Sequence, residues 1–369
     1  MGLALNNESV LKKYAELCES EYFVDKSSII NQINKLIGSS DVYLCVARPK
    51  QFGKTSIVNM LGAYYSKAVD SSAIFDNLKI SKYDDYKQHL NKYNVITISF
   101  NEISDNMNTY EKYITNITNQ VKKDIISEFG LNDIDDSDSL KRILQKSNQQ
   151  FVFLIDEWDY IFNNNLFEES QDKFLEFLRN LLKDESYVEL CYMTGVLPIK
   201  SGSALNMFDE FTFLKDRKFG EYFGFTEAEV LDLCKQNKDM SFEKLESWYN
   251  GYTTAKGIKI YNPYSVVKAL KNNYCESYWI NTRVMDELSE YLKCNVFEIR
   301  DDVIKMVSGE EIDIVIGEEF RAGQGEPKTK AEIYSAMIVL GFLAYDDGYL
   351  KIPNKELMIE FEKVLRHKI

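Results

Sequence analysis

The segment RPKQFGKT, residues 48–55, constrains the fold of this chain more than any other stretch. It follows the apolar run DVYLCVA at residues 41–47, which predicts a short buried strand. The segment SIVNMLGAYYSKA after it has apolar residues at helical spacing. A strand, a tight loop containing glycine and a helix that begins at Lys-Thr together form a phosphate-binding loop. Its backbone N–H groups and the helix N-terminus bind the phosphate oxygens.

The loop departs from the usual pattern at one position, because Arg48 stands where a glycine is expected. An ordinary loop with a helix cap is therefore the alternative reading. In the phosphate-binding reading, Lys54 reaches the β- and γ-phosphate oxygens and the Thr55 hydroxyl holds Mg²⁺. The expected nucleotide-binding residues are Arg48, Pro49, Lys50, Gln51, Phe52, Gly53, Lys54, Thr55 and Ser56.

A second apolar run ends in two acidic residues about a hundred positions downstream. Residues 151–155, FVFLI, predict a central parallel strand covered on both faces. Asp156 and Glu157 follow at its carboxyl end, where ligands bind in open α/β sheets. We expect Asp156 to hold Mg²⁺ through water and Glu157 to polarise the attacking water. The alternative is an exposed acidic pair at a strand end.

Two more segments predict parallel core strands, NVITISFNEI at residues 94–103 and YVELCYMTG at residues 187–195. Thr194, near the end of the second, either senses the γ-phosphate or closes the strand before a glycine turn. Helical segments separate these strands, and this alternation predicts an α/β fold with helices on both faces of the sheet. The fold class that we expect is a three-layer P-loop NTPase sandwich with a mostly parallel sheet.

Several sequence blocks occur in the same order as in a known family. They are YFVDKSSII at residues 22–30, RPKQFGKT, LIDEWDY, YMTGVLPI, ESWYNGY, and YNPYSVVKAL followed by YWINT. Together they resemble the AAA-ATPase-like family, a group of P-loop ATPases that often carry a C-terminal PD-(D/E)xK-type nuclease domain. In that family an arginine is usual at the position of Arg48. The resemblance implies ATP and Mg²⁺ as cofactors.

The C-terminal part resembles the connector that precedes the nuclease in such proteins, over residues 308–316 and 331–365. The chain stops at Ile369, so we expect no nuclease domain. The spacing of Asp313, Glu326 and Lys328 mimics a nuclease triad. Glu326 and Lys328 lie in the polar, glycine-containing stretch RAGQGEPKTK, which predicts a loop and not a packed strand.

Three parts are expected along the chain: an ATPase core at residues 1–216, a helical lid at residues 217–285, and a small mixed α/β segment at residues 286–369. The lid begins at GFTEAEVLDLCK, where Thr226 predicts a helix N-cap and Glu229 completes a capping box. The last segment is expected to be winged-helix-like, with a hairpin around Asp347 and Gly348.

Composition limits the other function classes. The net charge of −14 argues against a continuous nucleic-acid surface, whereas Arg48, Lys50 and Lys54 supply local positive charge for ATP. The six scattered cysteines and two histidines make disulfide, zinc and histidine-triad chemistry improbable. No signal segment or membrane-length apolar run occurs, so we expect a cytoplasmic protein. The Asn/Thr-Lys-x-Asp tetrad for guanine is missing, which favours adenine.

Two functions remain open. In the first, Mg²⁺-dependent ATP hydrolysis drives a conformational change of the lid and the C-terminal segment. In the second, the chain is a nucleotide-gated interaction module with negligible turnover that reports to a protein partner or separate effector. The complete set of Lys54, Thr55, Asp156 and Glu157 favours hydrolysis, which we expect to be slow or partner-stimulated.

An arginine can complete such a site from within the chain or from a neighbouring subunit of an oligomer. Arg48 is expected to order the loop or contact the lid. Arg179, in the helix predicted after Asp156, could act on a neighbouring subunit. Arg217, where the chain enters the lid, is the favoured candidate for an arginine finger that acts on the nucleotide of its own chain.

Overall fold

A computed structural model describes residues 2–101, 103, 107–135, 137–237, 239–279 and 299–366. The chain divides into two compact units. The first contains Met1–Val46, Lys54–Gly195 and Ile199–Glu210, and the second contains Ala47–Gly53, Val196–Pro198 and Phe211–Ile369. The expected lid boundary after residue 285 lies outside the described residues, as do 280–282 of YWINT, Cys294 and His367. The division into three parts therefore stays a prediction.

The first unit is built on one sheet with strand order β2-β3-β4-β1-β5. Its strands are β1 (Tyr43–Ala47), β2 (Asn94–Ser99), β3 (Phe151–Asp156), β4 (Val188–Gly195) and β5 (Asp209–Phe211). The β2–β3 and β3–β4 pairs are parallel. Every residue of β3 is buried, as a strand covered on both faces requires. The four predicted core strands are therefore confirmed.

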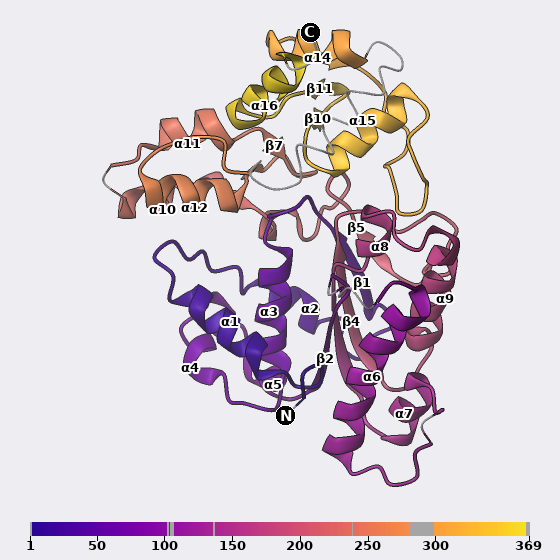
Figure 1. Cartoon of the computed structure of the whole chain (residues 1–369). Helices are drawn as coiled ribbons and strands as arrows, with labels where there is room; N and C mark the ends of the chain where they lie inside the picture. The colour runs from indigo at the N-terminus through magenta and orange to yellow at the C-terminus, as the bar shows by residue number, and fades with distance from the viewer. Residues whose placement is uncertain are drawn as a thin grey trace. The chain divides into compact units, whose positions relative to one another are not determined.

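Helices cover both faces of this sheet, which confirms the three-layer sandwich (Figure 1). One face carries α1 (Glu8–Cys18), α2 (Ile29–Asn34), α3 (Lys54–Tyr65), α4 (Ser72–Phe75) and α5 (Tyr86–His89). The other face carries α6 (Tyr110–Phe129), α7 (Leu140–Lys146), α8 (Tyr160–Asn163) and α9 (Gln171–Leu182). Short 3₁₀ turns lie at Lys79–Lys82 and Glu168–Ser170.

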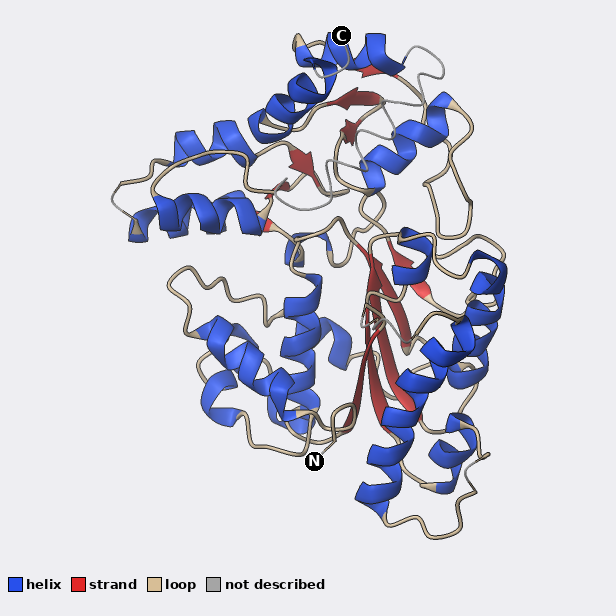
Figure 2. Ribbon diagram, in the orientation of Figure 1, coloured by secondary structure: helices blue, strands red, loops and turns tan. Residues whose placement is uncertain are grey.

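The second unit contains two small antiparallel sheets as well as helices (Figure 2). One sheet has the order β6-β8-β7, and the other has the order β10-β11-β9. The elements of the segment expected to be a lid are a 3₁₀ turn at Gly220–Tyr222, β6 (Phe225–Thr226), α10 (Glu227–Gln236), α11 (Phe242–Tyr249), β7 (Tyr252–Thr253), β8 (Lys259–Tyr261) and α12 (Pro263–Asn272). This segment is thus helical with a small sheet added.

The remaining described elements belong to the expected C-terminal segment. They are α14 (Ile299–Val307), β9 (Ile312–Asp313), α15 (Lys330–Val339), β10 (Ala344–Asp346), β11 (Tyr349–Lys351) and α16 (Lys355–Arg366). Their apolar side chains share one buried cluster with Phe52, Tyr252 and Trp279. The residues on either side of position 285 therefore contribute to a common core within the second unit.

Two local predictions in this unit are confirmed. Thr226 caps α10, and its side chain and that of Glu229 bond each other's backbone in a capping box. Asp347 and Gly348 join β10 to the antiparallel β11, and both have positive φ values, of 46° and 90°. Two consecutive positive φ values are typical of the tight turns that match the twist of a hairpin.

Among the described residues, no helix has both the length and the apolar composition needed to cross a membrane.

Candidate functional site

The loop between β1 and α3 has the backbone form of an anion-binding loop. Gln51 and Gly53 have φ values of 65° and 89°, and the intervening Phe52 does not share this conformation. Alternation of this kind turns successive N–H groups toward a common concave side, where an anion can bind. Lys54 is the first residue of α3 and its side chain is buried. The positive end of the helix dipole and a lysine charge therefore coincide at this position.

Thr55 and Asp156 meet although 101 positions separate them in the sequence. The Thr55 hydroxyl donates to Asp156 Oδ2 at 2.7 Å. The other carboxylate oxygen, Oδ1, is buried and has no hydrogen-bond partner among the described residues. A hydroxyl oxygen and an unpartnered carboxylate oxygen are hard ligands of the type that Mg²⁺ prefers. These residues therefore fit a magnesium ion.

The environment of Asp156 affects its protonation. Burial raises the pKa of the carboxyl above its usual value, while the Thr55 hydrogen bond and the nearby charge of Lys54 act in the opposite direction. A carboxylate in such a position gains from a cation that replaces the lost hydration.

Polar side chains from three neighbouring strands lie in register at the carboxyl edge of the sheet. Asp156 is the register partner of Ser99 on β2 and of Thr194 on β4. β4 lies between β3 and β1, so Thr194 stands between the acidic strand end and the strand that leads into the loop. The Thr194 hydroxyl donates to the Val46 carbonyl on β1 at 3.1 Å.

Glu157 has an unusual backbone conformation immediately after β3. Its φ is 51°, in the left-handed region that non-glycine residues seldom adopt. The next residue, Trp158, donates its N–H to the Thr194 carbonyl at 3.2 Å, which fixes the turn. A Cβ atom on Gly195 would lie only 2.4 Å from Asp159 Oδ1, so glycine is required beneath this turn. Such strain commonly marks functional positions.

Arg48 and Phe52, both expected nucleotide ligands, belong to the second unit, and their side chains pack within it. The Arg48 guanidinium forms an ion pair with Asp216 and donates to the Phe211 carbonyl at 2.8 Å. The Phe52 ring packs edge-on against Phe213 and Tyr252. Contact of these two residues with a nucleotide would therefore come from the backbone.

The remaining expected residues differ in exposure. Pro49 is buried, Lys50, Gln51 and Ser56 are half-buried, and Thr55 is exposed. The Gln51 side-chain oxygen is buried and lacks a hydrogen-bond partner in the part of the chain that the structure describes.

The two candidate arginine fingers both reach solvent. Arg217 is exposed, and Arg179 lies 3.9 Å from Glu176 on the same face of α9. Their roles stay predictions.

Two residues with clear structural roles were missed by sequence reasoning. Ser99 is the polar end of a mainly apolar strand, the same pattern that Thr194 shows on β4. Asp216 is adjacent to Arg217 in the sequence, and nothing local shows that it pairs with Arg48, 168 positions away.

A parallel sheet between helical layers, with a phosphate-type loop after β1 and a Thr–Asp contact to β3, defines a P-loop NTPase fold. The family model described as "Predicted AAA-ATPase" matches residues 10–204. The chain belongs to this AAA-ATPase-like family.

Two solved structures show a loose likeness to the whole chain. A Walker-type ATPase of Pyrococcus abyssi is 13% identical, covers 90% of this chain and 95% of its own, and has a TM-score of 0.38. The ORC2 protein of Aeropyrum pernix, in ADPNP–ADP complexes, is 10% identical, covers 97% and 94%, and has a TM-score of 0.32. Both scores are low. A comparison with curated proteins finds no match.

Proposed function

We propose that this protein binds ATP with Mg²⁺ and hydrolyses it. The observation that supports this most directly is the contact of Thr55 with Asp156, which joins the loop helix to the acidic strand end. The buried, unpartnered Oδ1 of Asp156 adds to it, because an orphaned carboxylate oxygen is costly unless a cation binds there.

Each residue of the site has a distinct role in this proposal. The loop N–H groups and Lys54 bind the phosphate oxygens and neutralise their charge. Thr55 and Asp156 would hold Mg²⁺, which when bound neutralises charge that develops between the β- and γ-phosphates. Glu157 orients the attacking water and accepts its proton, and Thr194 reports the presence of the γ-phosphate to β1.

We further propose that turnover changes the arrangement of the segment after residue 216. A module that only binds ATP has no need of a carboxylate such as Glu157, so its presence favours hydrolysis over gated binding with negligible turnover. Comparison of multiple-turnover with single-turnover phosphate release separates these two functions.

The proposal is tested with two variants. Lys54→Ala should abolish measurable Mg·ATP binding, because it removes the side-chain charge on the phosphates. Glu157→Gln should bind ATP while turnover falls roughly a hundredfold, the effect expected when a general base is lost. Binding is measured by calorimetry and turnover by phosphate release.

Matched controls are available on α9 and beside it. Lys173 and Glu169 are exposed, and Lys173→Ala and Glu169→Gln should behave as the parent. ATP hydrolysis by Lys54→Ala at the parent rate would show that the loop is not the phosphate site. Loss of ATP binding in Glu157→Gln would assign Glu157 to the metal or to the fold.

A further inference from the structure

The loop residue Arg48 uses its guanidinium within the protein. It is 2% exposed. One terminal nitrogen donates to the carbonyls of Ala47 at 2.7 Å and Phe211 at 2.8 Å, and the other forms the ion pair with Asp216. The guanidinium carbon also lies 4.9 Å from the centre of the Phe223 ring. A side chain held in this way anchors the loop and is not directed to a phosphate.

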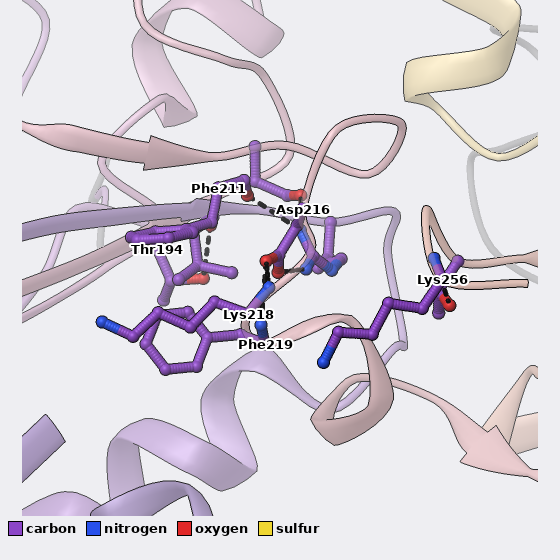
Figure 3. A network of polar contacts seen from close by, with 10 residues as sticks. Thr194, Phe211, Asp216, Lys218, Phe219 and Lys256 are labelled. Carbon is purple, nitrogen blue, oxygen red and sulfur yellow. Dashed lines mark hydrogen bonds and ion pairs between the residues drawn. The ribbon is translucent and has the colours of Figure 1, made fainter. Parts of the chain in front are cut away.

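Asp216 is built to receive this arginine. It is 3% exposed, and its second oxygen accepts the N–H groups of Lys218 at 2.6 Å and Phe219 at 2.8 Å (Figure 3). Its own N–H donates to the Thr212 carbonyl at 3.1 Å. Backbone groups therefore hold the carboxylate in place opposite Arg48, which makes the ion pair geometrically specific.

The segment of residues 211–224, which contains Asp216, contacts the loop at further points. Gly224 donates its N–H to the Phe52 carbonyl at 3.1 Å, and the Phe52 ring lies 5.8 Å from that of Phe213. Beyond this segment, Gly341 approaches so closely that a Cβ atom there would lie 2.8 Å from the Pro49 side chain. Residues 48, 49 and 52 are thus all held within the second unit. Lys54, which is expected to bind the phosphate oxygens, follows this loop directly.

We propose that Asp216 is a positioning residue of the nucleotide site, acting through Arg48 to hold the loop in its phosphate-binding form. This inference rests on the proposed function and adds a regulatory consequence. Because the ion pair joins the loop to residues 211–224, nucleotide binding and the order of that segment are thermodynamically linked. ATP should stabilise the segment, and a partner that displaces the segment should weaken ATP binding by the same factor.

The test uses an isosteric change. Asp216→Asn keeps the oxygen that accepts from Lys218 and Phe219 but removes the charge opposite Arg48. We expect the affinity for ATP to fall about tenfold or more, which lies within the usual range for coupling between two linked equilibria. Amide exchange of residues 47–53 should accelerate in the nucleotide-free chain. Asp209 is exposed on β5, and Asp209→Asn should match the parent in both measurements.

A second variant separates positioning from stability. Asp216→Asn alone leaves the Arg48 charge buried and uncompensated, which can destabilise the fold. Combining it with Arg48→Met removes both charges, so we expect the melting temperature to recover. ATP affinity should stay low, and ATP should no longer slow amide exchange in residues 211–224.

Parent-like ATP affinity and parent-like exchange of residues 47–53 in the double variant would overturn this inference and leave the proposed function standing. A parent chain that binds no ATP would overturn the proposed function. In that case the exchange of residues 47–53 without nucleotide still decides whether Asp216 orders the loop.

Discussion

At the scale of single residues, the loop depends on backbone conformations that few residue types adopt. Gly53 has a φ of 89°, yet a Cβ atom built on it would meet nothing within 4 Å. A side chain at this position is therefore disfavoured by local backbone strain alone. Glu157, with a φ of 51°, accepts similar strain without being glycine, which fits a position whose side chain is needed for function.

We predict that Gly53→Ala lowers the free energy of unfolding by about 1–2 kcal/mol, the usual strain of an L-residue in the left-handed region. ATP affinity should fall as well, because relaxation of the strain reorients the loop N–H groups. Urea unfolding and calorimetric titration measure the two effects. Gly317 is the control, since it also has open space around it but no positive φ. Unchanged stability in Gly53→Ala would mean that this conformation is not strained.

At the scale of elements, a buried carboxylate joins α16 to two other parts of the second unit. Glu356 is fully buried and accepts from the Ser265 hydroxyl on α12 at 2.9 Å. It also accepts the N–H groups of Tyr278 at 2.7 Å and Trp279 at 2.8 Å. Trp279 in turn packs 6.4 Å from the Phe52 ring of the loop. The carboxyl thus fixes the residues on which the loop rests.

This arrangement predicts a pH-dependent stability. Burial raises the pKa of the Glu356 carboxyl from 4.5 to about 7, and the nearby Glu360 adds to the effect. The folded state therefore holds a proton that the unfolded state has already lost between these two values. The free energy of unfolding should fall as the pH rises through this window, by about 3 kcal/mol in total from this group.

Glu356→Gln should reduce this slope, because the amide stays neutral and still accepts the two N–H groups. Relative to the parent, the variant should gain stability between about pH 5 and about pH 8, as measured by urea unfolding. Glu362 lies on the same helix, where it pairs with Arg366 at 3.1 Å, and Glu362→Gln should keep the parent slope. An unchanged slope in Glu356→Gln would show that another group carries the proton.

At the scale of the whole molecule, the proposed ATP hydrolysis needs a further positive charge beside the transferred phosphoryl group. Arg217 is exposed and forms no ion pair within the described residues, so its guanidinium is available. It directly follows Asp216, whose carboxylate anchors the loop. We predict that Arg217 supplies the charge in cis.

Arg217→Ala should lower turnover at saturating ATP by about a thousandfold, at the lower end of what an arginine finger contributes, with little change in ATP affinity. Arg366 is exposed at the end of α16, and Arg366→Ala is the control that should keep the parent turnover. An unchanged rate eliminates Arg217. Mixing Arg179→Ala chains with Glu157→Gln chains then tests whether activity is restored between subunits of an oligomer.

The sequence alone determined the local elements and the main residues of the proposed site. Mainly apolar runs predicted β1 to β4, because strands in a sheet covered on both faces have few polar positions, and β3 is buried throughout. The capping box at Thr226 and the Asp347–Gly348 turn were also predicted, since each depends only on neighbouring residues. Motif residues at the start of α3 and at the end of β3 predicted Thr55 and Asp156 as partners, and the structure brings these two into contact.

Only the tertiary structure decided the strand order, which places β4 and Thr194 between β1 and β3. It also decided that Arg48 pairs with Asp216 and that Phe52 joins the core around α14, α15 and α16. These pairings join residues far apart in the sequence. Their energy comes from burial and from charge compensation, which depend on what surrounds a side chain and leave no periodic signal in the chain itself.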